Sequence, residues 1–118
     1  MTDRTLTATR RSHPTGASVV AVTGELDHHT AHDLTRAIEE TPFTPDAPVV
    51  IDLTGLSYCD STGITVLVAA YNRAKQAGAT LVLAGLNADL MRVFGIVGLD
   101  QLFTFQPTVE DAISALHP

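Results

Sequence analysis

The sequence VVIDLTGLSYCDSTGITVLV, residues 49–68, contains a strand pattern, a polar turn and the start of a helix in direct succession. Residues 49–53 form an almost unbroken apolar run without glycine or proline, which is typical of a strand buried on both faces of a largely parallel sheet. An apolar stripe at helical spacing follows the turn and consists of Ile64, Leu67, Val68 and Tyr71. The pattern predicts a buried strand that leads through a short polar turn into a helix.

The polar turn places a hydroxyl group at the predicted start of this helix. Asp60 lies just ahead of the apolar stripe and is a good N-cap candidate, which makes Ser61 the first helical residue. The first turn of a helix has unpaired backbone N–H groups and a partial positive charge, and both accommodate an anion such as phosphate. Ser61 is therefore a candidate phosphate carrier. Capping and loop geometry alone also explain Asp60 and Gly63.

Length and composition indicate one soluble domain that spans residues 1–118. The chain is 45% hydrophobic and 17% charged, which excludes a disordered composition. It has no run near the roughly 18 apolar residues that a membrane span needs. Residues 1–5 lead into polar sequence, so we expect no export signal, and the lone Cys59 cannot form an internal disulfide. These features favour a cytoplasmic protein without a membrane partner.

The charge pattern argues against direct nucleic-acid binding. Thirteen acidic residues outnumber seven basic ones, the net charge is −6, and the basic residues form no patch beyond Arg10 and Arg11. Lys75 is the single lysine, which excludes most lysine-dependent chemistry. The sequence also has no glycine-rich phosphate loop and no dinucleotide fingerprint, so we expect no cofactor, and any ATP must come from a partner.

The whole chain alternates between strand and helix patterns. Residues 5–11 and 17–23 predict a hairpin, and 24–29 a polar loop. Thr30 and Asp33 have capping-box spacing ahead of a helix with Ala31, Leu34 and Ile38 on one face. Later segments predict a strand at 80–84, a helix at 87–97, a strand near 102–105 and a terminal helix capped by Thr108. The order ββαβαβαβα predicts an α/β fold with a mixed, mostly parallel sheet of about five strands and four helices.

Two enzyme-like interpretations of the turn are disfavoured. A nucleophile elbow needs glycine two residues before and after Ser61; Gly63 is present, but Cys59 replaces the first glycine. Its base would have to be His117, the one histidine after the serine. A phospho-acceptor role for Asp60, as in receiver domains, needs an acidic pair after the first strand and a lysine after the last, and the chain has neither.

One histidine cluster resembles a metal site in composition. His28, His29 and His32 are flanked by acidic residues. His28 precedes the predicted cap at Thr30, so the i, i+4 pair does not lie on regular helix. We interpret the cluster as a solvated loop and helix start, and expect no metal.

Three motifs in this order resemble the bacterial anti-sigma factor antagonists of the STAS family. They are GELD at residues 24–27, VIDL at 50–53 followed by DSTG at 60–63, and VGLDQLF at 97–103. The likeness extends from about residue 5 to residue 116. Each motif is weak alone, and their shared order and spacing make the match specific. The resemblance implies a single STAS domain that is a regulatory binding protein and not an enzyme.

The resemblance also implies a mechanism called partner switching. In that family, the serine of the Asp-Ser-x-Gly motif is phosphorylated by the anti-sigma factor, a serine kinase that supplies the ATP; by position this serine is Ser61. The unphosphorylated antagonist would bind the kinase and free a sigma factor, and phosphorylation would switch binding off. A serine phosphatase would reset the protein. Thr62 is the second choice for the phosphate, and the expected partner surface is Asp27, Asp60, Ser61, Thr62 and Gly63.

Two further hypotheses come from the sequence. The alternative function is a STAS-type ligand-binding or scaffold domain that does not act on a sigma factor. Separately, the helix at 87–97 carries more apolar residues than one face can bury, so part of it is a candidate contact patch. Its apolar residues are Leu90, Met91, Val93, Phe94, Ile96 and Val97. A short helix sunk between its neighbours explains them equally well.

Overall fold

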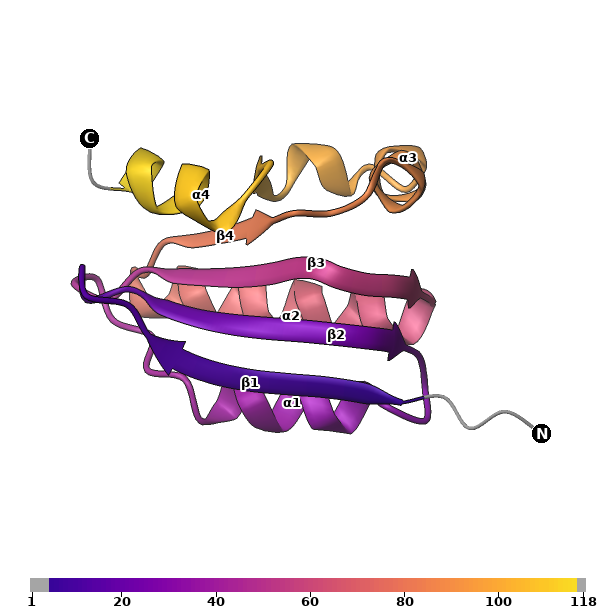
Figure 1. The fold of residues 1–118 in the computed structure, drawn as a ribbon, viewed down its shortest axis with the longest axis horizontal. Coiled ribbons are helices and arrows are strands. Elements are labelled where there is room, and N and C mark those ends of the chain that lie inside the picture. The colour runs from indigo at the N-terminus through magenta and orange to yellow at the C-terminus, as the bar shows by residue number, and fades with distance from the viewer. Residues whose placement is uncertain (1–4, 117–118) are drawn as a thin grey trace.

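A five-stranded sheet with helices on both sides forms the protein, as the computed structural model of residues 5–116 shows (Figure 1). The strands are β1 (Leu6–Ser12), β2 (Ser18–Leu26), β3 (Val49–Cys59), β4 (Leu81–Ala84) and β5 (Thr104–Gln106). The helices are α1 (Ala31–Glu39), α2 (Ser61–Ala77), α3 (Ala88–Ile96), the 3-10 helix η1 (Leu99–Gln101) and α4 (Val109–Leu116). The predicted element order and the mixed α/β fold are confirmed.

The sheet has its strands in chain order, β1-β2-β3-β4-β5. β1 pairs with β2 in antiparallel orientation, and the other neighbours are parallel. Parallel strands end at the same edge of a sheet, so the turns that follow β2, β3 and β4 come together at one end of the molecule. That end is the one toward which the arrowheads of β2 and β3 point in Figure 1.

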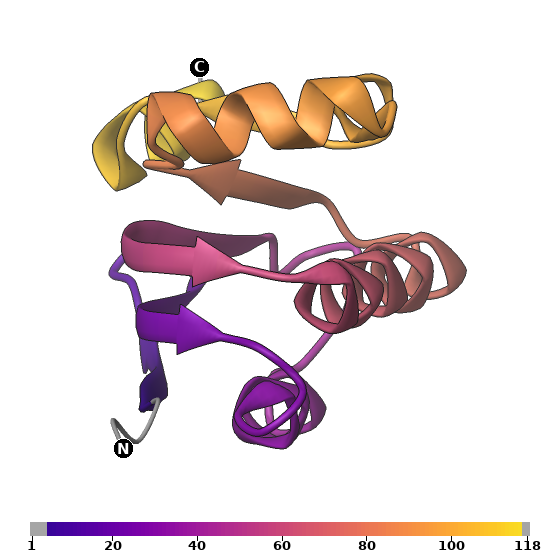
Figure 2. The same cartoon turned by 90° about the vertical axis from the view of Figure 1, so that its right-hand side faces the viewer.

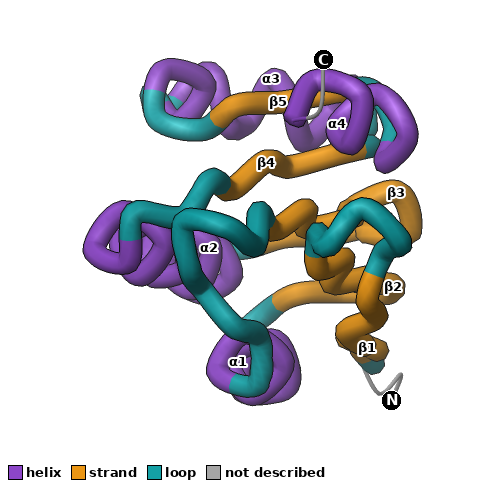
Figure 3. The backbone as a smooth tube through the Cα atoms, turned by 90° about the vertical axis from the view of Figure 1, so that its left-hand side faces the viewer, coloured by secondary structure: helices purple, strands orange, loops and turns teal. Residues whose placement is uncertain are grey.

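Helices cover the two faces of the sheet unequally. α1 and α2 lie on one face, and Figure 2 shows both on the same side of the strands. α4 lies on the other face, where Ala112 and Ile113 pack against Val50 and Val82. α3 lies beyond β4, with Leu90 and Phe94 buried against the same cluster as α1 and α2 (Figure 3).

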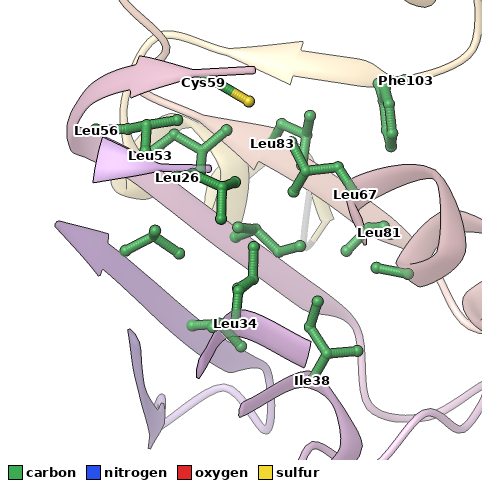
Figure 4. Packing of buried hydrophobic residues seen from close by; sticks show 14 of the residues in the cluster. Leu26, Leu34, Ile38, Leu53, Leu56, Cys59, Leu67, Leu81, Leu83 and Phe103 are labelled. Atoms are coloured by element: carbon green, nitrogen blue, oxygen red, sulfur yellow. The ribbon is translucent and has the colours of Figure 1, made fainter. Parts of the chain in front are cut away.

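The larger core fills the space between the sheet and helices α1 and α2. Leucines from β2, β3, β4 and both helices meet there, and Figure 4 shows Leu26, Leu34, Leu53 and Leu67 among them. Val49, Val50, Ile51 and Leu53 are each 0% exposed, which confirms the prediction of a strand buried on both faces. β3 is the central strand of the domain, and its end positions the turn at Asp60.

The predicted apolar stripe on α2 is wrong in detail. The buried residues of α2 are Gly63, Leu67, Ala70 and Ala74, so only Leu67 belongs to both sets. Ile64, Val68 and Tyr71 lie at the margin of the core and are partly buried. Small side chains let α2 approach the sheet closely, and the larger residues of the predicted stripe flank the contact.

The end of β2 also differs from the prediction. Residues 24–26 belong to β2, although the polar composition predicts a loop from residue 24 onward. The pairing of β2 with β3 continues as far as Leu26 opposite Cys59, with register shifts between Ala21 and Thr23 and between Gly24 and Glu25. Gly24 has a φ of 113°, a conformation that glycine adopts without strain, so the strand continues through the irregularity.

Candidate functional site

The turn between β3 and α2 presents Ser61 at the surface. Asp60 has an extended backbone, and its Oδ1 accepts a hydrogen bond from the Gly63 amide at 3.0 Å. Ser61 is the first residue of α2 and is exposed, whereas Thr62 is half-buried. The predicted cap at Asp60 is therefore confirmed, and it holds an accessible hydroxyl on the first turn of a 17-residue helix.

Gly63 packs inward beneath this turn. A methyl group at Gly63 would lie 2.6 Å from Leu26 Cγ and 2.9 Å from Cys59 Sγ, distances that real side chains do not reach. Gly63 is buried, so glycine is required here for α2 to pack on the ends of β2 and β3. This requirement is structural, and the role of Gly63 toward a partner stays a prediction.

The loop that follows β2 lies directly beside the Ser61 turn. The Asp60 amide donates to the Leu26 carbonyl oxygen at 3.1 Å, which connects the two loops. Asp27, the next residue, is 3% exposed, and its Oδ1 accepts from the amides of His29 at 2.9 Å and Thr30 at 3.1 Å. The structure thus places the loop of Asp27 next to the turn of Asp60. The Asp27 carboxylate stabilises its own loop by accepting hydrogen bonds from two of its amides. Its contact with a partner stays a prediction.

The capping box predicted at Thr30 and Asp33 is wrong. Thr30 makes no side-chain cap hydrogen bond; its Oγ1 donates to the Glu25 carbonyl at 2.7 Å and accepts from the Asp27 amide at 3.0 Å. The Asp27 carboxylate accepts instead from the amides of His29 and Thr30, which precede the helix, and the Asp27 backbone carbonyl accepts from the Ala31 amide at 2.8 Å. The spacing is right for a cap, but the Thr30 hydroxyl is turned back to the end of β2, where it bonds to Glu25 and Asp27.

Three residues near the turn carry no role in the sequence prediction. Thr65 Oγ1 donates to the Ser61 carbonyl at 3.0 Å and is exposed one turn below it. Ser57 Oγ donates to the Gly24 carbonyl at 3.0 Å, and Tyr58 is 40% exposed. The polar residues that follow the apolar run of β3 are the signal in the sequence for an exposed strand end.

Three histidines follow Asp27: His28 and His29 lie on its loop, and His32 lies in the first turn of α1. The rings of His28 and His29 are in tilted contact with 3.9 Å between their centroids, and His32 Nε2 lies 3.3 Å from Asp33 Oδ1. Within residues 5–116, no group of three or more histidine, cysteine, aspartate or glutamate side chains could hold a metal ion. His117, the base that a hydrolase would need, lies outside the described residues.

Cys59 is buried next to the cap, and its thiol is poorly ionised. Burial, and secondarily the Asp60 carboxylate, raises the pKa of Cys59 to about 12. In the unfolded chain the thiol has its normal pKa of 9.0, so as the pH rises it ionises in the unfolded state before it ionises in the folded state. The contribution of Cys59 to the free energy of unfolding is therefore fully present below about pH 9 and is lost between about pH 9 and 12. We expect this contribution to fall by about 1.4 kcal/mol per pH unit in that window, measured by urea unfolding. Cys59→Ala should remove that part of the slope; an unchanged slope would contradict the shift.

Removal of the cap at Asp60 should destabilise the protein moderately. We expect Asp60→Ala to lower the free energy of unfolding by about 1 kcal/mol, because the Gly63 amide loses its acceptor. Thr108→Ala is the matched control, since Thr108 Oγ1 accepts from the Asp111 amide at the start of α4. Both variants should lose similar stability in chemical denaturation. An Asp60→Ala protein as stable as wild type would show that the cap is energetically silent.

The chain is similar to known proteins over nearly its full length. The model of the STAS domain family matches residues 8–112. An anti-sigma-B factor antagonist of Listeria monocytogenes is 40% identical over 83 residues, which cover 70% of this chain and 73% of that protein. The anti-sigma-F factor antagonist RsfB of Mycobacterium tuberculosis is 30% identical over 112 residues, 95% of this chain and 90% of that protein.

Solved structures give the same picture of the fold. An anti-sigma factor antagonist from Mycobacterium paratuberculosis superimposes with a TM-score of 0.82 at 30% identity, over 97% of this chain and 96% of that chain. The phosphorylated form of the Bacillus cell fate determinant SpoIIAA has a TM-score of 0.71 at 20% identity, over 94% of this chain and 100% of that chain. The second likeness shows a shared fold.

Proposed function

Since the chain belongs to the STAS domain family, with relatives named anti-sigma factor antagonists, we propose that it is an anti-sigma factor antagonist controlled at Ser61. In this proposal the unphosphorylated protein binds a serine-kinase anti-sigma factor and frees a sigma factor. The kinase transfers phosphate from its own ATP to Ser61, and a serine phosphatase removes it. The chain acts by binding and is not itself an enzyme. No helix within residues 5–116 is long and apolar enough to cross a membrane.

The observation that carries the proposal is the exposed hydroxyl of Ser61 at the first position of α2. Asp60 Oδ1 accepts from the Gly63 amide and fixes the turn, and the positive end of the helix dipole lies next to the Ser61 hydroxyl. Thr62 is less accessible, which favours Ser61 as the acceptor. The buried Asp27 carboxylate and the hydrogen bond between Asp60 and Leu26 support a preformed docking loop.

The charge change on phosphorylation suits a switch of binding. A phosphate adds about −1.5 to −2 charges beside Asp60, on a chain whose net charge is already −6. An interface that accepts the neutral hydroxyl of Ser61 would then bury an unpaired negative charge. The phosphate would also be repelled by nearby carboxylates such as Asp60. The helix start keeps the phosphate compatible with the fold, so binding can change without refolding.

The experiment is phosphopeptide mapping after incubation with ATP and each purified candidate anti-sigma kinase from the same genome. Wild type and Ser61→Ala are compared, with Thr62→Ala as the matched variant one residue away. The expected result is phosphate on Ser61 of wild type and Thr62→Ala, and none on Ser61→Ala. Absence of phosphate with every kinase shown to be active would reject the switch and favour a ligand-binding or scaffold domain.

A further inference from the structure

The side chain of Thr30 stabilises the loop between β2 and α1 from the inside. Thr30 is 4% exposed, and its Oγ1 donates to the Glu25 carbonyl oxygen at 2.7 Å and accepts from the Asp27 amide at 3.0 Å. One buried hydroxyl therefore connects the residue ahead of α1 to the end of β2. Because the bond to Asp27 is buried, water cannot readily replace it, and the shape of the loop depends on this hydroxyl.

Leu26, which lies inside this loop, connects it to the turn that carries Ser61. The Leu26 carbonyl oxygen accepts from the Asp60 amide at 3.1 Å. The Leu26 side chain is 0% exposed, and its Cγ lies 2.6 Å from the position that a Cβ on Gly63 would take, so it packs against the first turn of α2. Asp60 and Gly63 are the two partners of the cap at the start of α2. A shift of Leu26 would therefore displace the cap next to Ser61.

The position of the Ser61 hydroxyl matters for phosphoryl transfer. Catalysis of this reaction is mostly positioning and electrostatic stabilisation, since the transition state leaves little covalent chemistry for the protein to do. A misplacement of about 1 Å can cost on the order of a hundredfold in rate. Ser61 is exposed, so its position in the free protein is set mainly by the backbone of the turn, which the cap and Leu26 hold.

We propose that Thr30 is a positioning residue for the phosphorylation of Ser61. Its hydroxyl fixes the loop at residues 25–30, and the loop fixes the turn at Asp60. The inference rests on the proposed function and adds to it a buried residue, which acts through Leu26 and Asp60 and not by contact with the kinase. Loss of the hydroxyl should therefore lower kcat and leave KM nearly unchanged, because the side chains on the surface stay the same.

The test compares two variants of Thr30 with a matched variant of Thr41. Thr30→Val removes the hydroxyl and keeps the branched shape, whereas Thr30→Ser keeps the hydroxyl. Thr41 is 1% exposed, and its Oγ1 donates to the Ala37 carbonyl at 2.8 Å. It follows α1 at the end of the molecule opposite the turn between β3 and α2 (Figure 1). Thr41→Val thus removes a buried hydroxyl far from Ser61.

The kinase that phosphorylates wild-type Ser61 is the probe. We expect Thr30→Val to lower kcat at least about tenfold, with KM within about threefold of wild type. Thr30→Ser should keep kcat within about threefold, and Thr41→Val should keep both constants within about twofold. Both valine variants should unfold at lower urea concentration than wild type, because each loses a buried hydrogen bond.

Four outcomes would overturn the inference and leave the proposed function standing. They are phosphorylation of Thr30→Val as fast as that of Thr41→Val, an equal loss of kcat in these two variants, a rise in KM alone, and a Thr30→Ser protein as slow as Thr30→Val. The second outcome would assign the effect to stability, and the fourth would show that the hydroxyl is not its cause. Failure of every kinase to phosphorylate wild type rejects the proposed function and the inference with it.

Hydrogen exchange of the wild-type protein tests the same connection without any substitution. If the loop and the turn open as one unit, the amides of Asp27 and Asp60 should have protection factors within about threefold of each other. A larger difference would show that the two segments open independently. The turn would then be held without Thr30, and the inference would be wrong.

Discussion

Phosphorylation of Ser61, or its replacement by Asp, is expected to weaken binding to the anti-sigma kinase at least a hundredfold. A hundredfold corresponds to about 2.7 kcal/mol, which desolvation of one unpaired charge in an interface can supply. Ser61 is exposed in the free protein, so the added charge costs little before binding. Ser61→Ala should keep the affinity of the unphosphorylated form, because it removes only a hydroxyl.

Titration calorimetry on the purified pair measures this effect, with Ser114→Asp as the control. Ser114 is exposed on α4, so this variant makes the same chemical change away from the β3–α2 turn. Added salt should recover part of the affinity lost by Ser61→Asp, since it screens repulsion but leaves the desolvation cost. An equal loss in Ser114→Asp would mean that net charge alone controls binding. Tight binding by Ser61→Asp would contradict a switch at this position.

Gly24→Ala is expected to be strongly destabilising. Gly24 has a φ of 113°, and a methyl group there would lie 2.3 Å from the Thr5 carbonyl oxygen. That oxygen accepts a hydrogen bond from the Glu25 amide at 2.9 Å, so relief of the clash would break this bond. Strain and steric conflict together should cost about 3 kcal/mol or more in the free energy of unfolding.

Gly16→Ala separates strain from the clash. Gly16 has a φ of 94° in the hairpin turn, and nothing lies within 4 Å of the position that a Cβ would take there. We expect a loss of about 1 kcal/mol, from the backbone conformation alone. Urea unfolding of the two variants measures the difference. Equal losses would show that the backbone at Thr5 moves away from the added methyl group at no cost. The steric conflict at Gly24 would then contribute nothing to the loss of stability.

The cap predictions show how far local patterns can be trusted. The caps at Asp60 and Thr108 are confirmed, because each hydrogen bond involves residues close in the chain. The cap at Thr30 is not. Its hydroxyl donates to the Glu25 carbonyl and accepts from the Asp27 amide, since the end of β2 is held against β3 by contacts more than thirty residues apart.

The sequence alone determined the order of elements, the mixed sheet and the serine at the start of a helix, since these follow from periodicity, turn residues and caps over short stretches. Tertiary packing decided which side of α2 is buried: the small residues Gly63 and Ala70 face the sheet together with Leu67, and the other residues of the predicted stripe lie at the margin of the core. Packing also brought the Asp27 loop beside Ser61 and left Ile96 exposed. Such arrangements depend on which distant segments of the chain pack together across the sheet. Local sequence patterns do not specify these long-range contacts.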